Sequence, residues 1–183
     1  SFNGLFYNIQ KEEIVDLTGG IDDLNNKIIR MIGDPFKRIE EDRLRILRVC
    51  RFSATLGFDI DKDTKEAIKQ SDLSGVSRER IWDEFSKASK HFDKFLEIMV
   101  ELNVLSKCCD NVVLDTTIIK SDNYLMYLAL LFRKNSPKDI SSILVRNKLD
   151  RDKSNRIAFL ISFLHFNDNN IYSIWNNYRK FNI

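Results

Sequence analysis

The stretch that decides the fold is Glu41-Asp42-Arg43-Leu44-Arg45-Ile46-Leu47-Arg48-Val49-Cys50-Arg51-Phe52. Its charged residues recur at every third position, at Asp42, Arg45, Arg48 and Arg51. Side chains three residues apart are neighbours on a helix, so the spacing predicts one charged row along a single helix. Ile46, Leu47 and Val49 fill the other sides, which places the same helix in a core. A charged row on a partly buried helix needs an anion or a buried partner.

The pairing of Asp42 with Arg45 suggests one such partner. An ionised carboxylate only accepts hydrogen bonds, whereas a guanidinium only donates them. Side by side, the two groups can read the edge of a nucleobase. A structural network of ion pairs along a solvated helix face is the alternative interpretation of the same row.

Residues 41–58, EDRLRILRVCRFSATLGF, resemble the EDxxRxxRxxRF…LGF motif of class II tRNA nucleotidyltransferases and bacterial poly(A) polymerases. Three other segments resemble motifs of that family in the same order. They are SFNGL (1–5) for the end of RRDF-[ST]-x-N-[AG]-L, DLTGGIDDL (16–24) for the DL-x-GG-x-x-DL hinge, and IIRMIGDP (28–35) for the IR-x-IGDP run. The resemblance covers about residues 1–90.

The resemblance implies a mainly α fold with a multi-helical neck, body and tail. A short N-terminal β-hairpin would be left from the nucleotidyltransferase head. The expected divisions are a head remnant with hairpin and hinge over 1–24, a helical neck with the nucleotide-reading helix over 25–105, and a helical body and tail over 106–183. We expect the last segment to contact RNA.

The function implied is that of the C-terminal part of an RNA 3′-end nucleotidyltransferase, which adds CCA to tRNA or adds poly(A). Asp42 and Arg45 would pair with the Watson–Crick edges of C and A from the substrates CTP and ATP. Arg48 and Arg51 would hold the triphosphate or brace that pair, and Asn3 would complete the nucleotide-binding set. The partners implied are nucleoside triphosphates and the 3′ end of tRNA or another RNA.

Catalysis in this family depends on Mg²⁺ held by a DxD carboxylate pair, which we expect outside this chain. Asp59-Ile60-Asp61 has the DxD spelling, but it directly precedes a helical pattern, and Asp is a favoured helix cap. We therefore expect no catalytic residue and no metal ligand here, and no nucleotidyl transfer by the chain alone. Two alternatives stay open, a non-catalytic RNA-binding subunit that works with a separate head-domain chain, and a degenerate helical remnant.

Composition agrees with a helical, intracellular protein. The 183 residues are 43% hydrophobic, and only 6 Gly and 2 Pro are present, which favours helices over a turn-rich β fold. The net charge of +2 requires any RNA affinity to come from local patches. Three cysteines, two of them adjacent, do not form a disulfide framework, so we expect a cytoplasmic location. No apolar run approaches the roughly 20 residues of a membrane span, and no membrane partner is expected.

Local patterns predict the elements in chain order. The hairpin is expected from the apolar runs 5–9 and 13–17, and the charged row lies on a helix from Pro35 to Leu56 that Gly57 ends. Further helices are expected from Asp61 or Asp63 to about Gln70, over 77–99 with a break near 90–91, over 124–132 and 137–147, from Asp150 or Asp152, and after 170.

Overall fold

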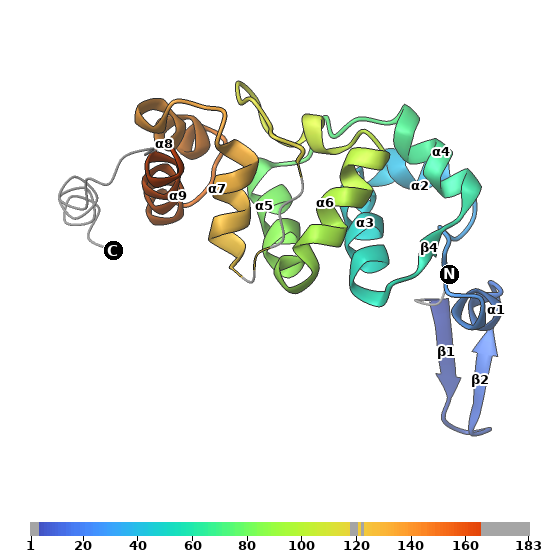
Figure 1. Ribbon diagram of the computed structural model, residues 1–183. Coiled ribbons are helices and arrows are strands. Elements are labelled where there is room, and N and C mark those ends of the chain that lie inside the picture. The colour runs from blue at the N-terminus through green and yellow to red at the C-terminus, as the bar shows by residue number, and fades with distance from the viewer. Residues whose placement is uncertain (1–3, 118–120, 122, 166–183) are drawn as a thin grey trace. The chain divides into compact units, whose positions relative to one another are not determined.

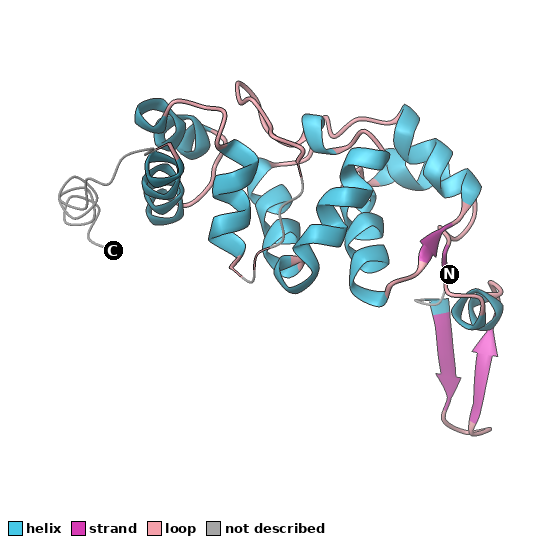
Figure 2. Ribbon diagram, in the orientation of Figure 1, coloured by secondary structure: helices cyan, strands magenta, loops and turns pink. Residues whose placement is uncertain are grey.

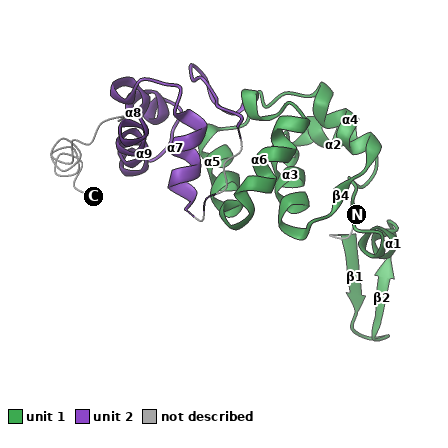
Figure 3. Ribbon diagram, viewed as in Figure 1, with its two compact units in different colours: residues 1–107 green, residues 108–183 purple. Residues whose placement is uncertain are grey.

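The computed structural model describes residues 4–117, 121 and 123–165 and divides into two compact units, Ser1–Lys107 and Cys108–Ile183 (Figure 3). The described residues are mainly helical, with two short strand pairs (Figure 2). The mainly α fold with an N-terminal hairpin is confirmed. No helix among the described residues is long and apolar enough to cross a membrane.

The first unit carries the strands and most of the helices (Figure 1). In chain order its elements are β1 (Leu5–Asn8), β2 (Glu13–Asp16), α1 (Gly20–Asn25), β3 (Ile28–Ile29), α2 (Pro35–Glu41), α3 (Arg45–Leu56), β4 (Asp59–Ile60), α4 (Lys62–Gln70), α5 (Arg78–Lys87), a 3₁₀ turn (Ser89–His91), α6 (Phe92–Glu101) and a second 3₁₀ turn (Leu105–Lys107).

The hairpin and the hinge after it are joined by one carboxylate. β1 and β2 pair antiparallel, with Phe6 opposite Val15. Asp16, the last residue of β2, accepts hydrogen bonds from the backbone N–H groups of Thr18, Gly20 and Ile21 at 2.9–3.0 Å. Gly19 has a positive φ of 70°, which glycine adopts without the steric cost of a Cβ atom. Asp16 and Gly19 together turn the chain from the strand into α1.

The prediction of one helix from Pro35 to Leu56 is wrong. The structure has two helices, α2 and α3, and Asp42 between them is extended with φ −154° and ψ 101°. The Asp42 carboxylate accepts from the backbone N–H of Leu44 at 3.2 Å. An Asp side chain that bonds the backbone two residues on competes with helical hydrogen bonding. Asp42 therefore lies at the corner before α3 rather than on the helix that carries the arginines.

A second strand pair was not predicted from the sequence. β3 and β4 pair in parallel, with Ile28 opposite Asp59 and Ile29 opposite Ile60. Each strand has only two residues, so neither shows the alternation by which strands are recognised in a sequence. The pairing brings the segment before α2 against the segment after α3.

The core of the first unit is aromatic. Phe85 of α5 packs edge-on to Phe95 of α6, with ring centroids 5.4 Å apart and planes at 90°, and Phe92 lies within 6 Å of both. All three are at most 1% exposed, and Ile46 and Leu47 of α3 are equally buried. Edge-to-face geometry of this kind adds about 0.5–1.5 kcal/mol per pair beyond burial. The core therefore holds α3, α5 and α6 as one block.

The second unit consists of three described helices, α7 (Tyr124–Phe132), α8 (Pro137–Arg146) and α9 (Arg151–Leu164). Asp150 caps α9 by accepting from the backbone N–H of Lys153 at 3.0 Å, and Pro137 begins α8. The buried Asp115 carboxylate contacts Arg133 at 2.8 Å. The predicted last helix, after residue 170, lies outside the described residues.

Candidate nucleotide-binding site

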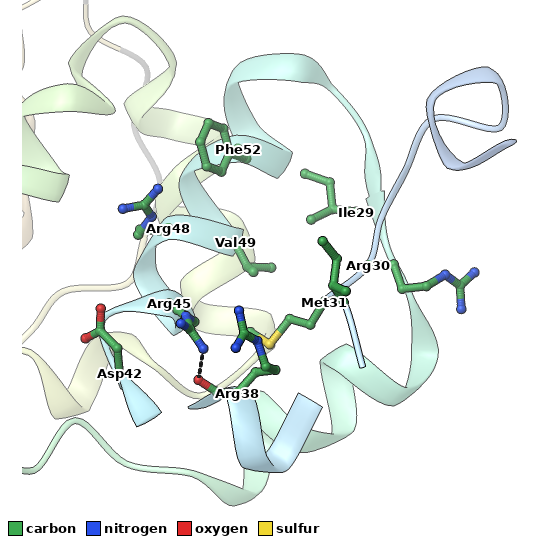
Figure 4. A pocket seen from close by; sticks show the side chains of 10 residues that line it. Ile29, Arg30, Met31, Arg38, Asp42, Arg45, Arg48, Val49 and Phe52 are labelled. Atoms are coloured by element: carbon green, nitrogen blue, oxygen red, sulfur yellow. Dashed lines mark hydrogen bonds between the residues drawn. The ribbon is translucent and has the colours of Figure 1, made fainter. Parts of the chain in front are cut away.

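A cavity of about 340 Å³ in the first unit contains three of the five predicted nucleotide-binding residues. It opens beside the corner between α2 and α3, and the figure shows its side chains from close by (Figure 4). The lining consists of Ile29, Arg30, Met31, Ile32, Arg38, Asp42, Arg45, Arg48, Val49 and Phe52.

One side of the cavity is apolar. Ile29 and Met31 come from β3 and the residue pair after it, and Val49 and Phe52 come from α3. The β3–β4 pairing places the first two opposite the helix. Ile29, Met31 and Val49 are each at most 9% exposed, so they are held in fixed positions by the core. An apolar wall of this kind suits the flat face of a base.

Arg45 is oriented by two contacts of one nitrogen. Its Nη1 donates to the backbone carbonyl of Arg38 at 2.6 Å, drawn as a dashed line in Figure 4, and to Glu41 Oε2 at 2.7 Å. Its Nε and Nη2 have no partner among the described residues. Since a guanidinium is planar and rigid, holding Nη1 also directs the remaining donors.

Glu41 links two of the arginines. Its Oε2 accepts from Arg38 at 2.6 Å as well as from Arg45. The hydrogen bond from Arg45, followed by the positive charge of Arg38, holds the pKa of the Glu41 carboxyl below its ordinary value. Glu41 therefore stays ionised and keeps both guanidinium groups at the mouth of the cavity.

Asp42 is held on both of its oxygens. Arg80 Nη2 donates to Oδ1 at 3.3 Å and to Oδ2 at 3.1 Å, and Oδ1 also takes the Leu44 amide. Asp42 thus presents an acceptor to the cavity beside the donors of Arg45.

Arg48 lies one helical turn beyond Arg45 on α3. It is exposed, and its side chain has no hydrogen-bond or ion-pair partner among the described residues. Its charge is available to an anion in solution. Arg38, from α2, adds a further guanidinium to the lining of the same cavity.

The structure places the other two predicted residues elsewhere. Arg51 does not line the cavity, because its Nε donates to Glu84 of α5 at 2.7 Å and its guanidinium lies 4.3 Å from the ring centre of Phe52. Only 15% of the Arg51 side chain and 3% of that of Glu84 are exposed. Arg51 thus ties α3 to α5. Asn3 lies outside the described residues.

The DxD spelling at residues 59–61 does not fit a metal ion. Asp61 caps α4 by accepting from the Thr64 amide at 3.2 Å, and its other oxygen accepts from Arg30 at 2.7 Å. That ion pair and a second one with Asp23 turn the Arg30 side chain away from the cavity (Figure 4). Over the described ranges, no group of three or more His, Cys, Asp or Glu side chains is placed to hold a metal ion.

Two residues that matter to the cavity were not found from the sequence. Arg38 lies on α2, four residues before Asp42, and lines the cavity, although nothing in the sequence indicated a role for it. Arg80 is 38 positions from Asp42. The only sequence signal for Arg80 is the SRERI segment (77–81), which resembles a neck segment of the family but does not indicate which residue Arg80 contacts.

Two family models match the chain. One is described as the "Poly A polymerase head domain" and matches residues 1–30. The other is described as "Probable RNA and SrmB-binding site of polymerase A" and matches residues 57–108, which contain α4, α5 and α6. The second match lies almost entirely before the 106–183 segment for which we expect RNA contact.

Curated relatives match part of the chain. The CCA-adding enzyme of Lactobacillus helveticus is 48% identical over 77 residues, which are 41% of this chain and 19% of the relative. The CCA-adding enzyme of Anoxybacillus flavithermus is 34% identical over 116 residues, or 61% of this chain and 29% of the relative. The matches therefore span about a fifth to three tenths of the relatives' length.

Solved structures share the fold over most of the chain. The Bacillus stearothermophilus CCA-adding enzyme in complex with CTP superposes with a TM-score of 0.68 at 22% identity, covering 91% of this chain and 45% of that one. A tRNA nucleotidyltransferase with a primer tRNA and an incoming ATP analogue gives a TM-score of 0.69 at 20% identity, covering 94% and 60%. The four sequence motifs, the two family models and the curated relatives support a member of the family of class II CCA-adding enzymes and poly(A) polymerases, and the solved structures show the same fold.

Proposed function

We propose that this chain supplies nucleotide selection and RNA binding to an RNA 3′-end nucleotidyltransferase that performs CCA or poly(A) addition. The observation that carries the proposal is the placement of Asp42 and Arg45 on one cavity, an acceptor beside donors, against an apolar wall. The CCA-adding relatives support the reaction class.

Base selection follows from the donor and acceptor pattern. Cytosine and adenine each present an amino donor next to a ring-nitrogen acceptor, and uracil and guanine present a carbonyl acceptor next to an N–H donor. Asp42, which only accepts, and Arg45, which only donates, match the first pattern. Opposite U or G, the acceptor Asp42 faces a carbonyl oxygen and the donor Arg45 faces an N–H group. Both protein groups then stay unpaired, which opposes binding.

The triphosphate would lie toward Arg48. An exposed arginine without a partner can form charge-assisted, bidentate bonds to phosphate oxygens. Arg38 is held by Glu41, so we assign it to the walls of the site rather than to the phosphates.

We assign no metal ion to the residues of this cavity. The described residues offer no set of carboxylates that fits Mg²⁺, so we propose that the ions of the parent enzyme are bound elsewhere and derive no step through them. The role of this part of the protein is to select the nucleotide and to orient its base.

A binding experiment with the 183-residue chain tests the proposal. Isothermal titration with CTP, UTP, ATP and GTP should show that CTP binds more tightly than UTP and ATP more tightly than GTP. Asp42→Ala and Arg45→Ala should each reduce that preference by roughly 1–3 kcal/mol, by analogy with bidentate base readout. Equal affinity of the wild-type chain for all four nucleotides would show that the cavity does not select bases.

A further inference from the structure

The contact between Arg80 and Asp42 joins the cavity to a helix that does not line it. Arg80 belongs to the first turn of α5, whereas Asp42 lies at the corner between α2 and α3. One nitrogen of Arg80 reaches both carboxylate oxygens, at 3.1 and 3.3 Å. The Leu44 amide also donates to Oδ1, so Oδ2 has fewer protein contacts than Oδ1.

α5 is itself fixed against α3, so the position of Arg80 is determined in advance of any ligand. Glu84 lies four residues after Arg80, on the same face of the helix, and contacts the largely buried Arg51 at 2.7 Å. Lys87 contacts the other oxygen of Glu84 at 3.1 Å. α5 is therefore held against α3 one helical turn after Arg80.

Stability alone does not account for the Arg80–Asp42 contact. The Arg80 side chain is 51% exposed and that of Asp42 is 33% exposed. Ion pairs that open to solvent in this way contribute little to folding free energy. The contact does, however, restrict which way the Asp42 carboxylate faces.

We propose that Arg80 is a positioning residue for base selection, which holds Asp42 so that Oδ2 accepts the amino group of cytosine or adenine. The inference rests on the proposed function of the cavity. A carboxylate offers about four lone-pair sites on its two oxygens. Arg80 and the Leu44 amide occupy three of them, two on Oδ1 and one on Oδ2, which leaves one site on Oδ2 for the base. Without Arg80, the carboxylate turns about its side-chain bonds and the acceptor loses its fixed direction.

The opposite role makes a different prediction. If Arg80 blocked Asp42 and had to leave before a base could bind, removing it would strengthen binding of CTP and ATP. The two roles are therefore separated by the sign of the change in affinity.

The experiment compares Arg80→Ala, Arg80→Lys and a matched control in the 183-residue chain. The control is Arg78→Ala, which removes the same charge two residues away on α5, where the arginine donates to the carbonyl of Lys107 instead. For each variant, titration gives the ratio of CTP to UTP affinity and of ATP to GTP affinity, and a thermal melt gives its folding. We expect Arg80→Ala to reduce both ratios by roughly tenfold, Arg80→Lys to restore part of the loss, and Arg78→Ala to keep the wild-type ratios.

The outcomes separate this inference from the proposed function. Wild-type ratios near one overturn both. Wild-type ratios well above one that persist in folded Arg80→Ala and Arg80→Lys overturn the positioning role alone, as does tighter binding of CTP by Arg80→Ala. If Arg80→Ala does not fold, Arg80→Lys decides, because it keeps the charge but cannot reproduce the planar guanidinium contact, and unchanged ratios in that variant also overturn the role.

Discussion

At the scale of single residues, the chain uses its charged groups for two different tasks. Arg51 and Arg45 belong to the same row in the sequence, but Arg51 is buried against Glu84 and Arg45 lines the cavity. Arg48, on the same helix, is left without a protein partner among the described residues. Burial and the available partners, rather than residue type, decide which arginine is structural.

The exposed Arg48 leads to the first prediction. Arg48→Ala should reduce the affinities for CTP, UTP, ATP and GTP by similar factors, because a phosphate contact does not depend on the base. The melting temperature should stay within about 1 °C of wild type, since exposed charges away from special contacts change stability little. Titration of all four nucleotides checks this, with Arg45→Ala as the comparison that changes the ratios. A selective loss of CTP and ATP in Arg48→Ala would instead make Arg48 a base-reading residue.

The hinge carboxylate Asp16 leads to a prediction about pH. Hydrogen bonds from the backbone N–H groups of Ile21, Gly20 and Thr18 lower the pKa of Asp16 from 3.8 to about 2. A pKa that is lower in the folded state stabilises the hinge above pH 4, and this contribution is lost as the pH falls through about 2. A carbon-detected NMR titration of the Asp16 carboxyl should give this midpoint. A midpoint near 3.8 would mean that the three amides do not bind the carboxylate in solution.

At the scale of elements, α5 supports the proposed nucleotide cavity. It carries Arg80 to Asp42 and Glu84 to Arg51, while Phe85 enters the aromatic core. Its N-terminus is fixed by Ser77, whose side chain accepts from the Arg80 amide. One helix thus connects the core to both ends of the charged row.

The buried Arg51–Glu84 pair gives the third prediction. Glu84→Ala leaves the Arg51 guanidinium largely buried without its carboxylate, which should cost about 3–5 kcal/mol of unfolding free energy. Asp83→Ala, one residue earlier, removes only the exposed contact with Lys87 and should cost less than about 1 kcal/mol. Urea unfolding of both variants measures the difference. Similar values for the two variants would show that the Arg51–Glu84 pair is not desolvated.

At the scale of the whole molecule, the proposed RNA binding raises the question of which segment would contact RNA. The sequence predicts the 106–183 segment, and the RNA-binding family model matches residues 57–108. In the second unit, exposed Lys138 and Arg151 line a cavity together with Ser141, Ser142 and Asn155. Cations beside hydroxyl and amide groups are the usual contacts of RNA phosphates.

A fourth prediction distinguishes the two segments. tRNA affinity should fall steeply with salt, with a log–log slope near 0.9 for each neutralised phosphate. If the second unit makes the contact, the double variant Lys138→Ala, Arg151→Ala should reduce the slope by about two. The matched double variant Lys62→Ala, Lys69→Ala removes two exposed charges from α4 and should leave the slope unchanged. The reverse result would place the contact in the 57–108 segment.

The fifth prediction concerns catalysis. The 183-residue chain, incubated with labelled CTP or ATP, Mg²⁺ and tRNA, should not extend the RNA, because its described residues include no carboxylate set for a metal ion. A complete CCA-adding relative serves as the positive control. Extension above a no-protein reaction would show that the chain holds a metal site of its own.

The sequence alone predicted much of this protein because the signals concerned are local. Apolar residues at helical spacing predicted the helices of both units, and Gly57, Asp61 and Ser77 marked their ends through their own backbone and side-chain preferences. The run from Glu41 to Phe52 indicated both the family and the charged residues of the cavity.

Tertiary structure decided what those charged residues do. The Asp42 carboxylate accepts from the Leu44 amide where the predicted long helix is interrupted, and Arg38 of the preceding helix α2 lines the cavity. Arg51 and Asp42 find their partners, Glu84 and Arg80, more than thirty residues away on α5. Spacing in a sequence fixes which side chains share a helix face, but not which group from another helix lies opposite, because that depends on how the apolar faces of α3, α5 and α6 pack.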